Sequence, residues 1–149
     1  MTNYAQFIRE VNITGCLLKQ AVGHMNNVYE KVNAGDVIYI ISNVLGKRVI
    51  IGELKVVKKF KSEKDDFIWE QFEEKLFKYR AYGIFTKYDL PIEVTESMAT
   101  DTPQGRPLSD SIILRGGHTV PLLKETAEII SELAIKHRLD KLIEVEELN

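Results

Sequence analysis

The chain contains two apolar runs separated by a short glycine-bearing segment, and this arrangement constrains the fold more than any other feature. Residues 37–41 are all apolar, which is typical of a strand buried on both faces. The second run begins at Val49 and residues 49–60 are expected to form the return strand, in which Gly52 indicates a bulge or a close backbone approach. The intervening residues 43–48 carry Gly46 and predict a hairpin turn. The chain is therefore expected to fold around a β-sheet.

Shorter segments predict the elements that surround this hairpin. Strands are expected at residues 79–85, 112–114 and, short and at a sheet edge, 91–94; residues 15–18 are expected to form a strand or bend. Helices are expected from Asp65 and Asp66 onward, at residues 24–32, and at residues 2–11, where a strand is the alternative. Residues 98–109, with two prolines and a glycine, predict a long loop.

The C-terminal helix is the clearest helical prediction. Thr119 is a candidate N-cap, and Pro121 suits the first helical turn. The helix is expected to end near residues 136–138, with residues 139–148 forming a last helical turn or a strand. Its buried stripe is expected to comprise Leu122, Leu123, Thr126, Ile129, Ile130, Leu133 and Ala134.

Strands and helices interleave without a regular βαβ rhythm. This pattern predicts an α+β fold: a small, mixed, mostly antiparallel β-barrel flanked by helices, with the amphipathic helix at its C-terminal end. At 149 residues the chain is expected to form a single domain, residues 1–149. Its net charge of -2 excludes a global basic field, so a contact with nucleic acid requires a local basic patch.

The cellular setting is expected to be the cytoplasm. A single cysteine excludes an intrachain disulfide. The first residues lack the basic end and apolar run of a signal peptide, and no segment approaches the roughly 18 apolar residues of a membrane helix. A membrane is therefore not expected among the partners.

The sequence carries no recognisable catalytic or metal-binding motif. His24, His118, His137 and Cys16 fall into no HxxxH, HExxH or CxxC spacing, and there is no GxSxG elbow. Cys16 lies in an apolar run and is expected to be a small buried hydrophobe. The chain is therefore predicted to be a binding protein and not an enzyme, with no cofactor, no metal and no catalytic residues.

A lysine run inside the second apolar segment is a candidate phosphate-binding surface. On a regular strand Lys55, Val57 and Lys59 share one face, and Lys58 points the other way beside Phe60. Lys58 and Lys59 are expected to contact nucleic-acid phosphates. The alternative is an edge strand that its lysines protect from aggregation.

Two further groups complete the candidate site. Arg80 and Tyr82 share a face of their strand and are expected to hold a base by hydrogen bonding and stacking. Trp69 is expected to add a stacking surface, with core packing as the alternative. Arg115 and His118 precede the predicted C-terminal helix, where free backbone N–H groups can hold an anion; the alternative is a plain turn and helix cap.

Several segments occur in the order seen in a known family. They are Gly15-Cys16-Leu17, a Val-x-x-Gly-Asp sequence ending at Asp36, the apolar residues 37–41 and 49–57, Tyr79-Arg80, and a glycine turn before the helix that carries Pro121. In this order, which covers most of the chain, they resemble the EVE domains of the PUA-like superfamily, most of all the small stand-alone archaeal and bacterial members. PUA and YTH domains are relatives within that superfamily.

The resemblance implies a compact β-barrel with a pocket between the barrel and its loops. It also implies a module that binds RNA or DNA and reads a modified or flipped base. Typical members open with a strand that carries Tyr-Trp, whereas this chain is expected to begin at the helix that follows that strand. The alternative function is a protein-interaction or small-ligand domain that has lost nucleic-acid binding and forms a homodimer through the sheet edge left exposed.

Overall fold

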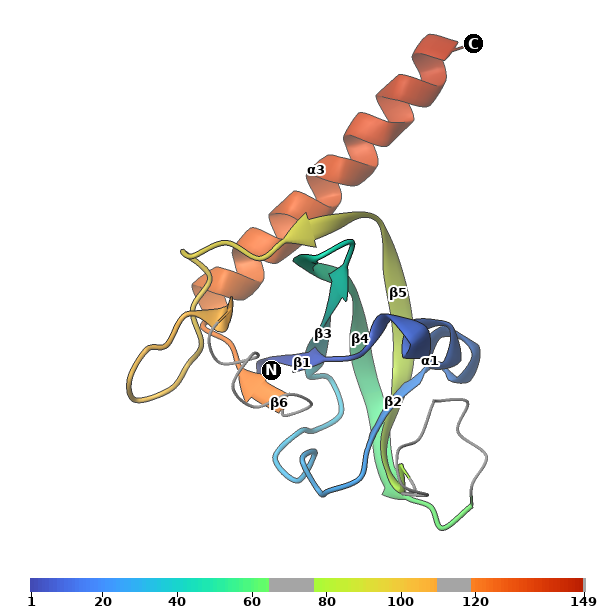
Figure 1. Cartoon of the computed structure of the whole chain (residues 1–149), viewed down its shortest axis with the longest axis vertical. Helices are drawn as coiled ribbons and strands as arrows, with labels where there is room; N and C mark the ends of the chain where they lie inside the picture. The colour runs from blue at the N-terminus through green and yellow to red at the C-terminus, as the bar shows by residue number, and fades with distance from the viewer. Residues whose placement is uncertain (65–76, 110–118, 149) are drawn as a thin grey trace.

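The computed structural model describes residues 1–64, 77–109 and 119–148, which form one curled sheet of six strands with two α-helices (Figure 1). The strand order is β2-β5-β4-β3-β1-β6. The strands are β1 Asn3–Phe7, β2 Ala21–His24, β3 Val37–Val44, β4 Lys47–Lys61, β5 Tyr79–Glu93 and β6 Thr119–Pro121. The helices are η1 Glu10–Asn12, α1 Ile13–Lys19 and α3 Lys124–Leu148. The α+β class and the curled, mostly antiparallel sheet agree with the prediction, and the sheet curls into an open half-barrel in place of the predicted barrel.

The chain opens with a strand, so the predicted helix at residues 2–11 is wrong and the alternative holds. Tyr4, Ala5 and Gln6 are buried one after another, which places both faces of β1 inside the protein. β1 lies between β3, to which it is parallel, and β6, to which it is antiparallel. The expectation that the chain begins at a helix, leaving a sheet edge unpaired at this point, is therefore also wrong.

The predictions for residues 15–18 and 24–32 are also wrong, and in both cases buried side chains explain the difference. Residues 15–18, expected to be a strand or bend, belong to α1, because the helix turns Ile13 and Cys16 into the core. The predicted helix at residues 24–32 is replaced by the end of β2 and a series of turns. Those turns are fixed by the buried Tyr29, whose hydroxyl donates to Gln6 Oε1 at 3.0 Å.

The β3–β4 hairpin is confirmed. Its tip is the Leu45-Gly46 pair, whose φ angles of 51° and 77° are both in the left-handed region that a type I′ turn requires. Gly52 also behaves as predicted. The β4 register shifts between Ile50 and Gly52, and a Cβ atom at residue 52 would meet the Thr86 carbonyl oxygen at 2.5 Å.

β5 is one continuous strand where two were predicted. Residues 79–85 and residues 91–93 of the predicted 91–94 strand both belong to it, and it pairs with β4 from Lys61↔Tyr79 to Val49↔Glu93. β2 covers the other side of β5 only at Tyr79–Tyr82. Pro91 lies outside the part of β5 that pairs with β2. Proline has no backbone N–H, and at this position β2 does not require one. The predicted strand at 112–114 and the helix from Asp65 lie outside the described residues.

The C-terminal helix begins later and ends later than predicted. Thr119 and Pro121 do not cap it but form β6, in which Pro121 pairs with Tyr4. α3 continues through Leu148 instead of ending near residues 136–138, so residues 139–148 are helical and the strand alternative is wrong. Thr126 and Ile130 are buried as expected, but Ile129 is 38 % exposed. No helix in the described part of the chain is both long and apolar enough to cross a membrane.

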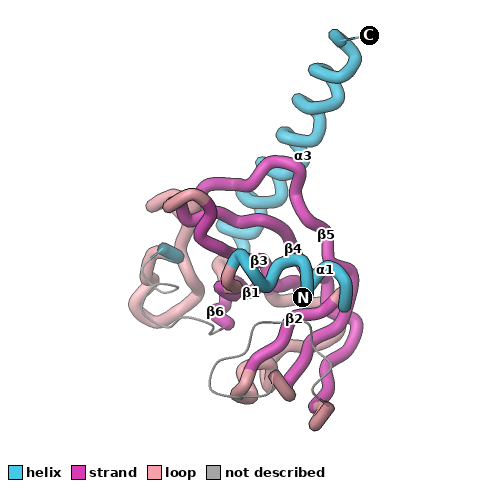
Figure 2. The backbone as a smooth tube through the Cα atoms, turned by 45° about the vertical axis from the view of Figure 1, so that its right-hand side comes forward, coloured by secondary structure: helices cyan, strands magenta, loops and turns pink. Residues whose placement is uncertain are grey.

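Figure 2 shows the curl of the sheet. Each face of the sheet carries its own hydrophobic core. The inner core lies under α1 and includes Ile13, Cys16, Val22, Ile38, Ile40, Leu54, Val56, Ala81 and Phe85. The outer core lies under α3 and the loop of residues 98–109, and includes Tyr39, Ile41, Ile50, Met98, Leu108, Ala127 and Ile130. Neither core includes Phe60 or Tyr82 on the outer face of β4 and β5, and the candidate site lies there.

Gly83 tests how closely β4 and β5 approach each other. A Cβ atom at this position would overlap the carbonyl oxygen of Lys55 and crowd Val56. We expect Gly83→Ala to lower the free energy of unfolding by about 3 kcal/mol or more in urea denaturation, because backbone atoms cannot move aside cheaply. Gly105→Ala is the control: its surroundings are open and its φ of +59° alone opposes the methyl group, which costs about 1 kcal/mol. Equal losses would contradict the close approach.

Candidate functional site

Two aromatic rings stack on the outer face of the β4–β5 pair. Phe60 pairs with Arg80 and Lys58 pairs with Tyr82, so Phe60 and Tyr82 are diagonal neighbours on one face. Their ring centroids lie 4.7 Å apart with an interplanar angle of 6°. Lys58 Nζ lies 5.6 Å from the Phe60 ring centroid. We call Lys58, Phe60 and Tyr82 the aromatic platform.

The platform is accessible and continues into an apolar surface. Phe60 is 42 % exposed, which is unusual for a large ring placed on a central strand pair. Val57 and Ile84 are 59 % and 60 % exposed on the same face, beside Lys55, which pairs with Ile84. The outer face thus combines stacked rings, aliphatic groups and lysines.

A bulge in β4 decides which lysines reach this face. The β4 register shifts between Val56 and Lys58, so two residues of β4 oppose one residue of β5. After the shift Lys59 opposes the buried Ala81 and points inward, whereas Lys55 opposes the exposed Ile84. The prediction that Lys55 and Lys59 share a face is therefore wrong, because the extra residue reverses the alternation of the strand.

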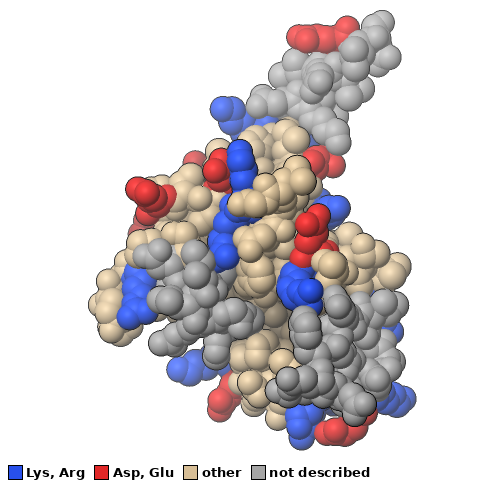
Figure 3. All heavy atoms as spheres, viewed as in Figure 1, with Lys and Arg blue, Asp and Glu red and all other residues tan. Residues whose placement is uncertain are grey.

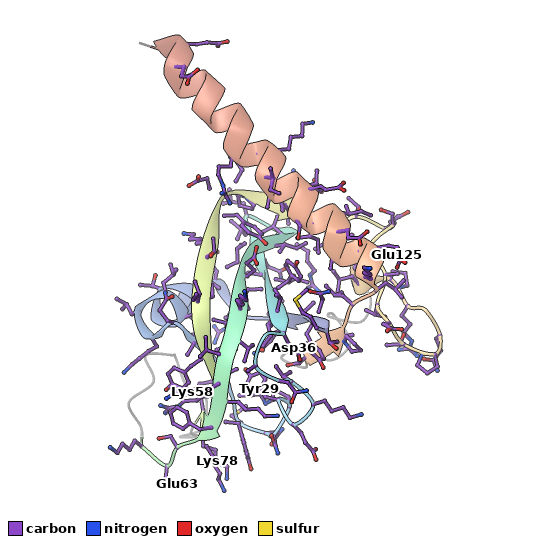
Figure 4. The ribbon with its side chains drawn as sticks, turned by 180° about the vertical axis from the view of Figure 1, so that it is seen from behind. Tyr29, Asp36, Lys58, Glu63, Lys78 and Glu125 are labelled. Carbon is purple, nitrogen blue, oxygen red and sulfur yellow. The ribbon has the colours of Figure 1, made fainter. Side chains whose placement is uncertain are left out.

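Lys59 is tied to the inner face and serves the fold there. Its ammonium group donates to the carbonyl oxygens of Tyr29 at 2.9 Å and Glu30 at 2.7 Å. The turn that carries these carbonyls is thereby fastened to β4. Figure 4 shows Lys58 and Tyr29 near this end of the strand pair, with Lys78 and Glu63 at its lower tip.

A cavity of about 360 Å³ opens on the inner side of the same strand ends. Asn27, Tyr29 and Glu30 line it from the turn, and Lys59, Phe60, Lys61, Tyr79 and Arg80 line it from the strands. Lys61 Nζ and Lys78 Nζ lie 5.8 Å and 5.5 Å from the Tyr79 ring centroid. Burial raises the pKa of Tyr29, so its hydroxyl stays neutral and donates to Gln6. The cavity thus has an aromatic wall with two cations beside it.

Arg80 lies between the platform and this cavity, and it is only 2 % exposed. It shares the face of Tyr82 as predicted, with Nη1 at 3.4 Å from the tyrosine hydroxyl. Its Nε donates to the Phe77 carbonyl at 3.1 Å and its Nη2 to the Lys64 carbonyl at 2.8 Å. Through these hydrogen bonds Arg80 joins the chain segments before and after residues 65–76. Its contact with the Tyr82 hydroxyl also helps to hold the Tyr82 side chain in place.

The structure brings together Lys58, Lys59, Arg80 and Tyr82 of the predicted site residues. Trp69, Arg115 and His118 lie outside the described residues. The structure adds Phe60 and Tyr79 to the candidate site. Phe60 within the lysine-rich β4 and Tyr79 next to Lys78 were usable signals in the sequence, but the positions of both rings depend on the β4–β5 register.

Cys16 is a free, fully buried thiol, in agreement with the sequence interpretation. Among the described residues, no three His, Cys, Asp or Glu side chains come close enough together to hold a metal ion.

The comparisons with known proteins add no family to these observations. No protein-family model matches the chain, and no curated protein matches it.

Replacing Arg80 tests its supporting role. Arg80→Met keeps most of the side-chain length but leaves the Phe77 and Lys64 carbonyls without their donor. We expect a loss of about 2–4 kcal/mol in the free energy of unfolding, measured by urea denaturation. Arg106→Met, on an exposed loop, is the matched control and should change stability by less than about 0.5 kcal/mol. A small loss at Arg80 would mean that its hydrogen bonds are dispensable.

Proposed function

We propose that this protein is a nucleic-acid-binding module whose aromatic platform stacks against an exposed base. The observation that carries the proposal is the Phe60–Tyr82 pair, stacked, accessible and flanked by Lys58. Stacking on an aromatic ring contributes about 1–3 kcal/mol per base and needs a base that is unpaired or extruded from a helix. A single strand or a flipped base is therefore the favoured ligand.

The charges around the platform support this proposal. The described residues at this end of the β4–β5 pair include Lys55, Lys58, Lys61, Lys64 and Lys78. Glu63 offsets only part of this charge, through its 3.6 Å contact with Lys61. A local basic cluster on a chain of net charge -2 is what a phosphate-contacting surface requires.

The inner cavity extends the proposal to base recognition. Its volume lies within the range of small-ligand sites, and Tyr79 supplies a stacking wall near Lys61 and Lys78. We assign Arg80 the role of positioning Tyr82 and the cavity rim, since its guanidinium group already bonds two carbonyls. The resemblance to EVE domains is part of the same proposal and agrees with a mixed, curled sheet beside a pocket.

One observation favours the alternative, a protein-interaction domain. Val57 and Ile84 lie exposed beside the platform, and aliphatic groups of this kind suit a protein partner better than a sugar–phosphate backbone. The two functions differ in their salt dependence and in their response to a charge reversal. Nucleic-acid binding must weaken steeply with salt, whereas an apolar protein contact need not.

Fluorescence anisotropy with labelled oligonucleotides tests the proposal. The panel contains single- and double-stranded RNA and DNA, plain and base-methylated, each at low and moderate salt. We expect single strands to bind, Phe60→Ala and Tyr82→Ala to weaken binding about tenfold or more, and Lys58→Glu to reduce the salt dependence. A preference for one methylated strand would support base reading in the inner cavity.

Lys47→Glu is the matched control, because Lys47 is also exposed but lies at the opposite end of β4. It should leave affinity within about twofold. Thermal melting of every variant checks the fold. The proposal is wrong if no oligonucleotide binds at low salt, or if the affinity changes neither with salt nor with Lys58→Glu. The search would then turn to protein partners.

A further inference from the structure

The ammonium group of Lys59 is held in a defined orientation at the wall of the inner cavity. It donates to the carbonyl oxygens of Tyr29 at 2.9 Å and Glu30 at 2.7 Å, and all three residues line the cavity. A lysine ammonium group carries three N–H donors and no acceptor. Among the described residues these two carbonyls are its only acceptors, so one N–H donor remains for a ligand.

The turn that holds Lys59 is itself anchored to the sheet. Tyr29 is buried, and its hydroxyl donates to Gln6 Oε1 at 3.0 Å. The Tyr4 hydroxyl donates to the carbonyl oxygen of Lys31, on the same turn, at 3.1 Å. A lysine side chain usually loses rotamer freedom when it binds a ligand, but Lys59 has already lost much of that freedom on folding. Its third N–H is therefore a preorganised donor.

The surroundings of this donor suit a base better than a phosphate group. Tyr79 lines the same cavity and provides a ring on which a base can stack. Lys61 and Lys78 lie beside this ring and can contact the phosphates that flank a stacked base. The two carbonyl oxygens bonded to Lys59 offset part of its positive charge, which weakens its attraction for a free anion. Figure 3 shows both basic and acidic side chains around the lower end of the molecule, where β4 ends and β5 begins, so net charge alone does not select the ligand.

We propose that the remaining N–H of Lys59 donates to the exocyclic carbonyl oxygen of a base stacked on Tyr79, so that the cavity selects keto bases. Guanine presents this oxygen at O6 and thymine or uracil at O4, whereas adenine and cytosine carry an amino group, a donor, at the corresponding position. An amino group would face the ammonium group donor to donor and leave its N–H unpaired, which is the costly case for a polar site. This inference rests on the proposed function and adds the class of base that the cavity accepts.

Fluorescence anisotropy with short single strands that differ at one purine tests this selection in the unaltered protein. The variable position carries guanine, hypoxanthine, adenine or 2-aminopurine, and the flanking bases are all adenine, which can stack on the aromatic platform. Guanine and hypoxanthine have the O6 oxygen, and the other two bases lack it. We expect the two keto strands to bind about tenfold more tightly than the other two. Because hypoxanthine lacks the N2 amino group and 2-aminopurine keeps it, the comparison separates O6 from N2.

Lys59→Met removes the donor and keeps most of the side-chain length. In this variant the four strands should bind within about twofold of one another, because nothing then reads the O6 position. Lys61→Met is the matched control: Lys61 also lines the cavity from β4, and its ion pair is the 3.6 Å contact with Glu63. It should weaken all four strands equally and preserve the preference for keto bases. Thermal melting of both variants checks the fold.

Three outcomes would overturn this inference. They are equal affinity for the four strands in the unaltered protein, a keto preference that survives Lys59→Met, and a uniform loss of affinity in Lys59→Met, which would place its donor on a phosphate. If Lys59→Met does not fold, the four strands still decide the matter in the unaltered protein. Strands that bind through Phe60 and Tyr82 without discrimination refute only the keto selection, whereas an absence of all binding refutes the proposed function as well.

Discussion

The pairing of β4 with β5 is the interaction on which the rest of the structure depends. Both strands are 15 residues long, and their pairing runs from Lys61↔Tyr79 to Val49↔Glu93 with two interruptions. Strands of this length must twist and coil, and the two register shifts, at Ile50/Gly52 and Val56/Lys58, provide the local irregularities that allow it. The curl of the half-barrel, and therefore the inner core beneath α1, follows from this pair.

The same two strands are covered unequally, and this difference creates the candidate site. Near Ile50 and Ile92 their outer face lies under α3 and the loop of residues 98–109. Near Phe60 and Tyr82, no described element of that core covers the outer face, and the residues there are aromatic rings and lysines. Arg80 stabilises the uncovered end from within by bonding the Phe77 and Lys64 carbonyls. The site can thus remain accessible without losing its geometry.

Local rules predicted part of this arrangement and failed at identifiable points. The β3–β4 hairpin and the Gly52 bulge follow from apolar runs and glycine, whose conformational requirements act over a few residues. β1 was misjudged because Tyr4, Phe7 and Ile8 have a spacing that suits a helix, whereas the parallel partner β3 lies some thirty residues away. The start of α3 was misjudged for a similar reason, since β6 needs β1 as its partner.

For the candidate site, the sequence by itself determined the residue types: lysines, an arginine and aromatic rings on strands near one another. Only the tertiary structure decided their roles. The bulge at Val56/Lys58 turned Lys58 outward and Lys59 inward, and it did so because two residues of β4 oppose one residue of β5. Arg80 is buried and therefore stabilises the strand ends instead of facing solvent. The pairing of β4 with β5 places the Phe60 ring against the Tyr82 ring. These outcomes depend on contacts between strands that are distant in sequence, and the pattern along a single strand does not contain them.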